Sequence, residues 1–310
     1  MASALIATVA DERFIDQAKQ LFASVYFAGA WPGDYMLLSF GISSDQRRWF
    51  EERGVLVKNC DPLFTEKQWR ERMSQEALEG TSKYSAATMG KFYLLGPEFR
   101  RWKTVVYLDC DIIVRAPLNR LTTVTGFSAV PDYGKTLEDQ FIDRKYATNL
   151  NDVLEDLSQR YSLLAPTFNA GVFAFPTSMI PDGAFDHIVA LAKRYMDVAR
   201  YGDQLAWNLF FYGRWTHLSY TYNYFIYYLT NLGATASAKR FYGAVLHFPG
   251  LEQRPWDPTN VFHNEWRENL RSSENMDVRI PTILPVTTRI ANHFRLQWAT
   301  IRDRIWEKKL

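Results

Sequence analysis

Two aspartates separated by one residue, Asp109 and Asp111, are the side chains whose type and spacing most clearly favour chemistry in this sequence. They follow the apolar run Thr104–Leu108 and precede the β-branched residues Ile112–Val114, a pattern typical of a buried parallel strand. Because side chains alternate along a strand, both carboxylates are predicted to point to the same side. Neighbouring buried carboxylates repel each other unless a cation lies between them or one of them holds a proton. The pair therefore predicts a metal-assisted reaction at the carboxyl end of a strand, where ligands bind in open α/β sheets.

A third metal-binding side chain is expected at the end of a later strand. His247 ends the apolar stretch that begins at Gly243. A single histidine on an apolar strand is usually a hydrogen-bonded core residue, but this one shares the strand-end position of the two aspartates. Two carboxylates and one imidazole suit a divalent manganese or magnesium ion with open positions for substrate phosphates.

Polar residues also interrupt two other apolar segments. Asn169 and Gly171 lie near the start of the predicted strand Phe168–Phe175. Asn169 could close a turn, but a carboxamide beside a bare glycine backbone also suits the close approach of a polar ligand. Asp203 and Gln204 open a later helix, where Asp203 taken alone would be read as an N-cap.

The elements that carry these residues alternate between strand and helix. Strands are predicted at Ala4–Ala10, Tyr35–Phe40, Val55–Val57, Thr104–Val114, Phe127–Val130, Phe168–Phe175 and Gly243–His247. Helices are predicted at Asp11–Val25, Ser43–Gly54, Thr65–Leu78, Ala86–Leu95, Asp182–Ala199 and Gly202–Phe211. Strand–helix–strand order with short loops predicts an α/β fold, with a Rossmann-like, mostly parallel sheet flanked by helices. Since neither a G-x-G-x-x-G nor a Walker motif is present, the phosphates of a bound nucleotide would be held by a metal.

Composition narrows the class of protein. Of the 310 residues 47% are hydrophobic and 23% charged, as in an ordinary globular protein. A net charge of +2 gives no global attraction to nucleic acid, so no nucleic-acid partner is expected. The two cysteines, Cys60 and Cys110, make no disulfide framework, which favours a reduced, cytoplasmic compartment.

Four motifs occur in the order seen in glycosyltransferase family 8, which includes glycogenin, bacterial lipopolysaccharide galactosyltransferases and galactinol synthases. They are Leu108–Asp111, Phe168–Phe173, Asp203 with Gln204, and His247–Gly250 followed by Arg254-Pro-Trp256. The resemblance runs from about Ala4 to Trp256. It implies a GT-A fold, a UDP-glucose or UDP-galactose donor, and manganese with magnesium as the substitute. It also implies transfer of a hexose, with retention of anomeric configuration, to a hydroxyl of a glycan, a lipid-linked saccharide or a small molecule.

The resemblance also implies a role for individual residues. Asp109, Asp111 and His247 are similar to the family's metal ligands, and Asp203 and Gln204 to its reaction-centre residues. The expected donor-binding residues are Thr8, Lys91, Asp109, Asn169, Ala170, Gly250 and Arg254. Two departures stand out, because one residue is inserted after Gly250 and an arginine, Arg254, replaces the usual lysine. A third is Phe14, which stands where many members have a tyrosine.

Two other functions compete with this interpretation. A strand followed by Asp-x-Asp also begins haloacid-dehalogenase-type phosphatases, where the first aspartate is the nucleophile. That signature normally lies near the N-terminus, is followed by an acidic pair, and leaves His247 unexplained. The second alternative is a non-catalytic sugar-binding homologue, suggested by an aromatic content of 15%. The intact metal-binding residues argue against it.

Beyond the motifs, three regions are assigned by pattern. Residues 1–260 are expected to form the catalytic domain and residues 261–310 a C-terminal extension. The polar, helix-prone residues 133–165 are read equally as a surface insertion or as a lid over the acceptor.

The end of the chain has the pattern of an amphipathic helix. In residues 289–310, large apolar side chains recur at spacings of three and four, and basic residues outnumber acidic ones. Such a helix would pack on the catalytic domain, or it would bind an anionic membrane surface and make the enzyme peripheral to the membrane. A homodimer is compatible with the resemblance.

Overall fold

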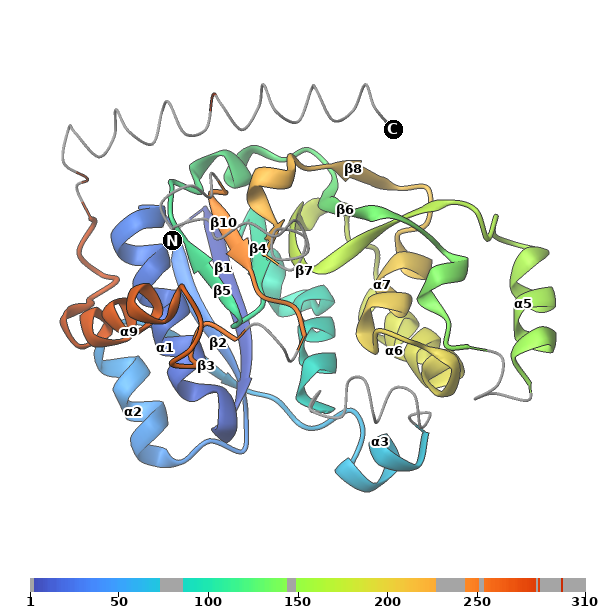
Figure 1. The fold of residues 1–310 in the computed structure, drawn as a ribbon, viewed down its shortest axis with the longest axis horizontal. Coiled ribbons are helices and arrows are strands. Elements are labelled where there is room, and N and C mark those ends of the chain that lie inside the picture. The colour runs from blue at the N-terminus through green and yellow to red at the C-terminus, as the bar shows by residue number, and fades with distance from the viewer. Residues whose placement is uncertain are drawn as a thin grey trace.

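The computed structural model describes residues 3–72, 86–143, 149–226, 243–250 and 254–282, together with Leu284 and Gln297. The predicted helix over 289–310 lies outside this range except for Gln297, as do residues 144–148 of the predicted insertion. Figure 1 shows strands through the middle of the molecule, with α1, α2 and α9 at one end and α5, α6 and α7 at the other. No helix among the described residues is both long and apolar enough to cross a membrane.

A seven-stranded sheet in the order β3-β2-β1-β4-β7-β6-β8 forms the centre of the fold. Its pairs are parallel except where β7 meets β4 and β6, so the predicted mostly parallel α/β sheet is confirmed. Its strands are β1 (Ala4–Asp11), β2 (Asp34–Phe40), β3 (Leu56–Asn59), β4 (Thr104–Leu108), β6 (Phe127–Thr136), β7 (Pro166–Pro176) and β8 (Trp215–His217).

A second, three-stranded sheet corrects one predicted strand. β5 (Ile112–Val114), β10 (Val245–His247) and β9 (Tyr224–Phe225) form this sheet, with β10 in the middle. The run from Thr104 to Val114 was predicted as one strand, but it is two strands in two sheets. The chain leaves the large sheet at Asp109, whose N–H still donates to the carbonyl of Gly171 at 2.8 Å. The apolar residues on both sides are equally buried, so hydrophobicity alone could not reveal this change of sheet.

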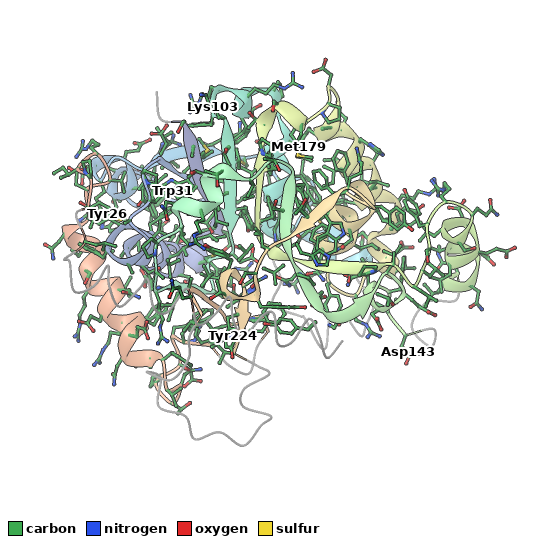
Figure 2. The ribbon with its side chains drawn as sticks, turned by 90° about the horizontal axis from the view of Figure 1, so that it is seen from above. Tyr26, Trp31, Lys103, Asp143, Met179 and Tyr224 are labelled. Atoms are coloured by element: carbon green, nitrogen blue, oxygen red, sulfur yellow. The ribbon has the colours of Figure 1, made fainter. Side chains whose placement is uncertain are left out.

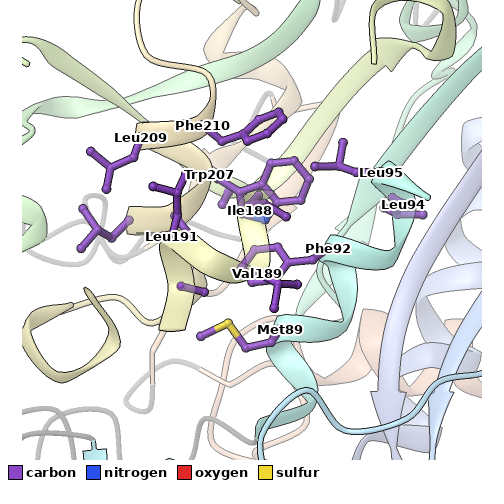
Figure 3. Close-up of a cluster of buried hydrophobic side chains, with 14 of the residues drawn as sticks. Met89, Phe92, Leu94, Leu95, Ile188, Val189, Leu191, Trp207, Leu209 and Phe210 are labelled. Atoms are coloured by element: carbon purple, nitrogen blue, oxygen red, sulfur yellow. The ribbon is translucent and has the colours of Figure 1, made fainter. Parts of the chain in front are cut away.

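Helices cover both faces of the large sheet (Figure 1). The α-helices among the described residues are α1 (Ile15–Ser24), α2 (Ser44–Glu52), α3 (Glu66–Arg72), α5 (Leu150–Ser158), α6 (Ala184–Tyr195), α7 (Asp203–Phe210) and α9 (His263–Ser272). Alternate residues of β4 enter different cores: Val105 and Tyr107 lie in one hydrophobic cluster, and Val106 and Leu108 in the other. The predicted helix Ala86–Leu95 is a 3₁₀ segment, and its apolar side chains point toward those of α6 and α7 (Figure 3).

The helix starts confirm two of the sequence signals. Ser43 and Gln46 form a reciprocal capping box, with bonds of 3.2 Å to Ser43 Oγ and 2.8 Å to Gln46 Oε1. Thr65 and Gln68 make the same pair of contacts at 3.1 Å and 3.0 Å before α3. Asp203 is different, because α7 begins at this residue and its N-cap position is occupied by Gly202.

The predicted end of one strand is also corrected. β6 continues past Pro131 to Thr136, so residues 133–136 belong to a strand instead of an insertion. Proline lacks an N–H and cannot donate to a neighbouring strand. Among the described residues, β8 pairs with residues 127–129 of β6, so Pro131 lies beyond the paired part of that edge. The pairing with β7 shifts register around Pro131, as at a β-bulge. Beyond the bulge, β6 continues with polar residues that include Asp132 and Lys135.

The C-terminal part of the described chain packs against the N-terminal helices. α9 contacts α1, and Arg53 donates to a carboxylate oxygen of Glu274 at 2.7 Å. Figure 2, seen from above, places Tyr26 near this end, Asp143 near the opposite end and Tyr224 of β9 between them. The second sheet therefore lies between the two ends of the molecule, near the carboxyl end of β4.

Candidate active site

A pocket of about 540 Å³ lies where β1 and β4 end. Because β1 and β4 are parallel, their carboxyl ends meet at one edge, and antiparallel β7 brings its first residues to the same edge. Predicted site residues that line it are Lys91, Asp109, Asp111, Asn169, Ala170, Asp203, Gln204, His247, Gly250 and Arg254. Thr8 is fully buried and lies one residue before the pocket wall, which begins at Val9.

Asp109, Asp111 and His247 form a compact group that could hold a metal ion, and it is called the metal-ligating group below. Their ligand atoms all lie within 4.8 Å of one another. His247 Nε2 is 3.2 Å from Asp111 Oδ1 and 4.0 Å from Asp109 Oδ2. The two aspartates follow β4, whereas His247 ends β10, so the group joins the two sheets.

Gly171 allows this group to form. A Cβ at position 171 would overlap the His247 ring and would lie 2.8 Å from Asp109 Oδ2. The sequence suggested that this glycine admits a polar ligand, and in the structure the space beside it holds two of the metal-ligating side chains.

Lys91 is a buried cation between two carboxylates. Its Nζ lies 3.1 Å from Asp109 Oδ1 and 3.0 Å from Asp203 Oδ2, and it donates to the carbonyl of Ala170 at 3.2 Å. Burial would lower the pKa of Lys91, but the charges of Asp109 and Asp203 raise it above its ordinary value. Lys91 therefore stays charged at neutral pH. The Tyr107 hydroxyl also donates to Asp109 Oδ1, at 2.6 Å.

Asp203 is a buried acid aimed into the pocket. Burial raises the pKa of its carboxyl to about 6 from an ordinary value of 3.8, while Lys91 opposes the shift. The interpretation of Asp203 as a helix cap is therefore wrong, since its side chain pairs with Lys91 instead.

Gln204 has every hydrogen-bonding position filled. Its Oε1 accepts from Asn169 Nδ2 at 2.9 Å and from the Ala170 N–H at 3.1 Å. Its Nε2 donates to Asp132 Oδ2 at 3.0 Å and to Gln140 Oε1 at 2.9 Å. A carboxamide with two acceptor bonds and two donor bonds is held in one orientation and makes a rigid part of the pocket wall.

The sequence does not identify Asp132 and Asn223 as site residues, because the residues around them suggest a strand end and ordinary packing. Asp132 lines the pocket, but it follows Pro131, which was read as the end of a strand. Burial raises its pKa, although Lys135 opposes the shift. Asn223 is fully buried, and its Oδ1 lies 2.7 Å from His247 Nδ1. The available signal is a lone carboxamide within a run of tyrosines, for which core packing is the default interpretation.

The outer part of the pocket is aromatic. Phe14 and Trp256 meet edge to face with ring centroids 6.4 Å apart. The guanidinium of Arg254 lies 5.6 Å from the Trp256 ring. On another wall, Lys135 of β6 donates to the Tyr201 hydroxyl at 2.6 Å. The pocket thus combines a carboxylate-rich centre, apolar rings at one side and a cationic side chain at the rim.

Comparisons with solved structures agree with this architecture. The galactosyltransferase LgtC, solved with donor and acceptor sugar analogs, has a TM-score of 0.60 at 17% identity, covering 92% of this chain and 99% of LgtC. The bifunctional glycosyltransferase WbbM has a TM-score of 0.60 at 19% identity, covering 87% of this chain and 50% of WbbM. GlyE of Streptococcus pneumoniae has a TM-score of 0.57 at 16% identity, covering 89% of this chain and 63% of GlyE. At these identities the likeness concerns the fold, which is the GT-A fold.

The amino-acid sequence shows the family to which the chain belongs. No curated protein sequence matches the chain significantly. The family described as glycosyl transferase family 8 matches residues 6–260, which is most of the chain and includes all the pocket residues named above. The chain therefore belongs to glycosyltransferase family 8 and is a glycosyltransferase with a GT-A fold.

Proposed function

We propose that this protein transfers a hexose from UDP-glucose or UDP-galactose to a sugar hydroxyl, with retention of anomeric configuration and with a divalent metal. The observation that carries the proposal is the group of Asp109, Asp111 and His247 beside the buried cation Lys91, all within one pocket. The acceptor is a glycan, a lipid-linked saccharide or a small molecule.

The side chains fit a hard or borderline divalent ion. Two carboxylates and one imidazole, with ligand atoms within 4.8 Å of one another, suit Mn²⁺ and leave coordination positions for phosphate oxygens. Mg²⁺ is the substitute, though an imidazole ligand favours Mn²⁺ over it. When bound, the ion would neutralise charge on the departing diphosphate.

The protein's own residues then divide the remaining work. Lys91 supplies a fixed positive charge near the leaving group, and Arg254 at the rim adds a second. Asp203 faces the position of the sugar and stabilises positive charge that develops at the anomeric carbon. Asn169 orients the sugar hydroxyls, and Gln204 holds Asn169 in place by accepting from its Nδ2.

Further contacts follow from the lining of the pocket. We assign Ala170 and Gly250 to donor binding, and Thr8 supports the donor from behind the wall. Lys135 and the adjoining residues of 133–165 form the acceptor wall, since Lys135 lines the pocket. Residues 1–260 are proposed as the catalytic domain and 261–310 as its extension. A homodimer, a cytoplasmic location and membrane contact through 289–310 complete the proposal.

The decisive experiment is incubation with a panel of nucleotide sugars plus Mn²⁺, with UDP release as the readout. Release from UDP-glucose or UDP-galactose that stops with EDTA and in Asp111→Ala supports the proposal. The anomeric configuration of the product, read by NMR, tests retention. Donor binding without any UDP release would indicate a non-catalytic sugar-binding protein. Phosphate release from simple phosphoesters would instead indicate a phosphatase.

A further inference from the structure

We infer that Asn223 is a positioning residue that fixes the ring tautomer of His247, so that Nε2 presents a lone pair to the metal. The inference rests on the proposed metal-dependent function for its purpose. The hydrogen-bond geometry that carries it is independent of that function. It also identifies what sets the orientation of Asn223: two backbone N–H groups of β7.

Two backbone N–H groups of β7 fix the orientation of the side-chain amides in the pocket wall. A backbone N–H can only donate, so the side-chain atom that it contacts must be an oxygen. The Gly171 N–H lies 2.9 Å from Asn169 Oδ1, and the Ala170 N–H lies 3.1 Å from Gln204 Oε1. These two contacts fix the amide orientations of Asn169 and Gln204.

The orientation then passes to Asn223. Since Asn169 Oδ1 can only accept, the atom of Asn223 that lies 2.8 Å from it must be the amide nitrogen. Asn169 Nδ2 donates to Gln204 Oε1 at 2.9 Å, which agrees with this orientation of the Asn169 amide. The remaining atom of the Asn223 amide, its oxygen, therefore faces His247.

The oxygen of Asn223 determines which ring nitrogen of His247 carries the hydrogen. Asn223 Oδ1 lies 2.7 Å from His247 Nδ1, and an oxygen that can only accept requires a hydrogen on that nitrogen. Neutral imidazole has one N–H, so Nε2 keeps its lone pair, 3.2 Å from Asp111 Oδ1. Asn223 and His247 are both buried, so Nδ1 depends on Asn223 as its acceptor.

Without Asn223 the aspartates would favour the wrong tautomer. The carboxylates of Asp109 and Asp111 attract an N–H on Nε2, which would block the nitrogen that must bind the metal. Asn223 opposes this preference by requiring the hydrogen on Nδ1. It acts through His247 and touches neither the substrate nor the ion.

The test is histidine NMR of the full-length, metal-free protein labelled with ¹⁵N-histidine, in which the two tautomers of the ring give different correlation patterns. The correlation pattern of His247 should show hydrogen on Nδ1 in the wild type and in Asn223→Asp, which keeps an acceptor oxygen. It should show hydrogen on Nε2 in Asn223→Leu and in Asn223→Ala. Asn208→Ala is the matched control, because Asn208 is also a buried carboxamide and, within the part of the chain that the structure describes, bonds to the backbone of Phe168 and Gln204.

Mn²⁺ binding, measured by electron paramagnetic resonance, gives the second readout. Affinity should fall roughly 10–100-fold in Asn223→Leu and stay near the wild-type value in Asn208→Ala. Hydrogen on Nε2 in the wild type, or on Nδ1 in a folded Asn223→Leu protein, would overturn the inference. If the wild type shows hydrogen on Nδ1 but binds no Mn²⁺, the proposed function fails while the positioning role of Asn223 stands. The wild-type spectrum decides the point even if a variant does not fold.

Discussion

The ammonium of Lys91 lies 3.0 Å from the carboxylate of Asp203, and both side chains are at least nine-tenths buried. A buried ion pair of this kind adds little to stability, because removing two charges from water offsets most of their attraction. Its presence in the pocket is better explained by chemistry that needs a fixed cation and a fixed anion. The first two predictions concern this pair.

Asp203→Asn is expected to abolish turnover, retain donor affinity and stabilise the metal-free protein. The pKa of Asp203 is about 6 when folded and near 3.8 when unfolded, so the folded state binds a proton more readily. Its charge therefore lowers stability progressively as pH rises from about 4 to 6, and the cost is full above that range. Asparagine removes a cost on the order of 2–3 kcal/mol at pH 7.5. Melting curves at pH 7.5 and 4 should show a higher melting temperature for the variant only at pH 7.5. A large loss of donor affinity would instead make Asp203 a binding residue.

Lys91→Met should destabilise the protein by roughly 3 kcal/mol, since it leaves Asp203 buried without its counter-charge. This loss is at the low end of the usual range for breaking a buried ion pair. The reason is that Asp109, the second carboxylate beside Lys91, is 30% exposed and remains in contact with water. Adding Asp203→Asn to Lys91→Met should restore most of the loss in urea denaturation. Lys58→Met is the matched control, since the Lys58–Glu98 pair lies at the surface and should contribute at most about 1 kcal/mol. Equal losses in the two single variants would contradict this account.

Removing any one metal ligand should abolish Mn²⁺-dependent binding of UDP without unfolding the protein. Asp111→Ala is the sharpest case, because it also relieves repulsion between two neighbouring carboxylates. The measurement is the UDP-induced rise in melting temperature, with and without EDTA. Survival of that rise in Asp111→Ala would show that the ion binds elsewhere.

Gly171→Ala should disrupt the metal site through its shape alone. The added methyl would overlap the His247 ring, so the ring or β7 must move, at a typical cost of about 1–3 kcal/mol. Mn²⁺ affinity is expected to fall at least tenfold. Gly126→Ala provides the control, because its Cβ would meet only Thr216 Oγ1, at 3.7 Å. Normal Mn²⁺ binding by Gly171→Ala would mean that the ion still binds after the His247 ring has moved, which would contradict this prediction.

The region 289–310 lies almost wholly outside the described residues, and its proposed membrane role can be tested directly. Full-length protein should co-sediment with anionic vesicles, and protein truncated after residue 285 should not. Each basic residue near such a surface contributes about 1 kcal/mol, so added salt should weaken the binding. Negligible binding by both proteins would leave only a packing role for this region.

The sequence was sufficient for the metal-ligating group because strand ends supply strong local signals. Asp109 and His247 each end an apolar run and Asp111 follows Asp109 by two residues, and polar side chains at strand ends are a local signal for a site. Their convergence is what the structure shows. The capping signals at Ser43 and Thr65 succeeded for the same reason, since all the interacting atoms lie within three residues.

Where the prediction gave a wrong strand or missed a site residue, the cause was contact between segments far apart in the sequence. The pairing of β5 with β10 joins segments more than 100 residues apart, so no local pattern separates β5 from β4. Asn223 and His247 are 24 residues apart, and the tyrosines around Asn223 suggested ordinary packing. Pro131 looks like a strand end because proline has no N–H for strand pairing. It is tolerated within β6 because β8 pairs with residues 127–129 and ends before Pro131, which the local sequence cannot show.

The placement of the metal-ligating group across two sheets has a thermodynamic consequence. His247 belongs to the small sheet, whereas Asp109 and Asp111 connect that sheet to β4. A cation held by all three would cross-link the sheets and stabilise the folded protein by an amount that grows with the logarithm of its free concentration over its dissociation constant. Amide hydrogen exchange in β9 and β10 should then slow more than exchange in β2 and β3, which lie far from the junction. Local opening of the small sheet would be coupled to metal occupancy, so the rigidity of this part of the molecule would depend on metal supply.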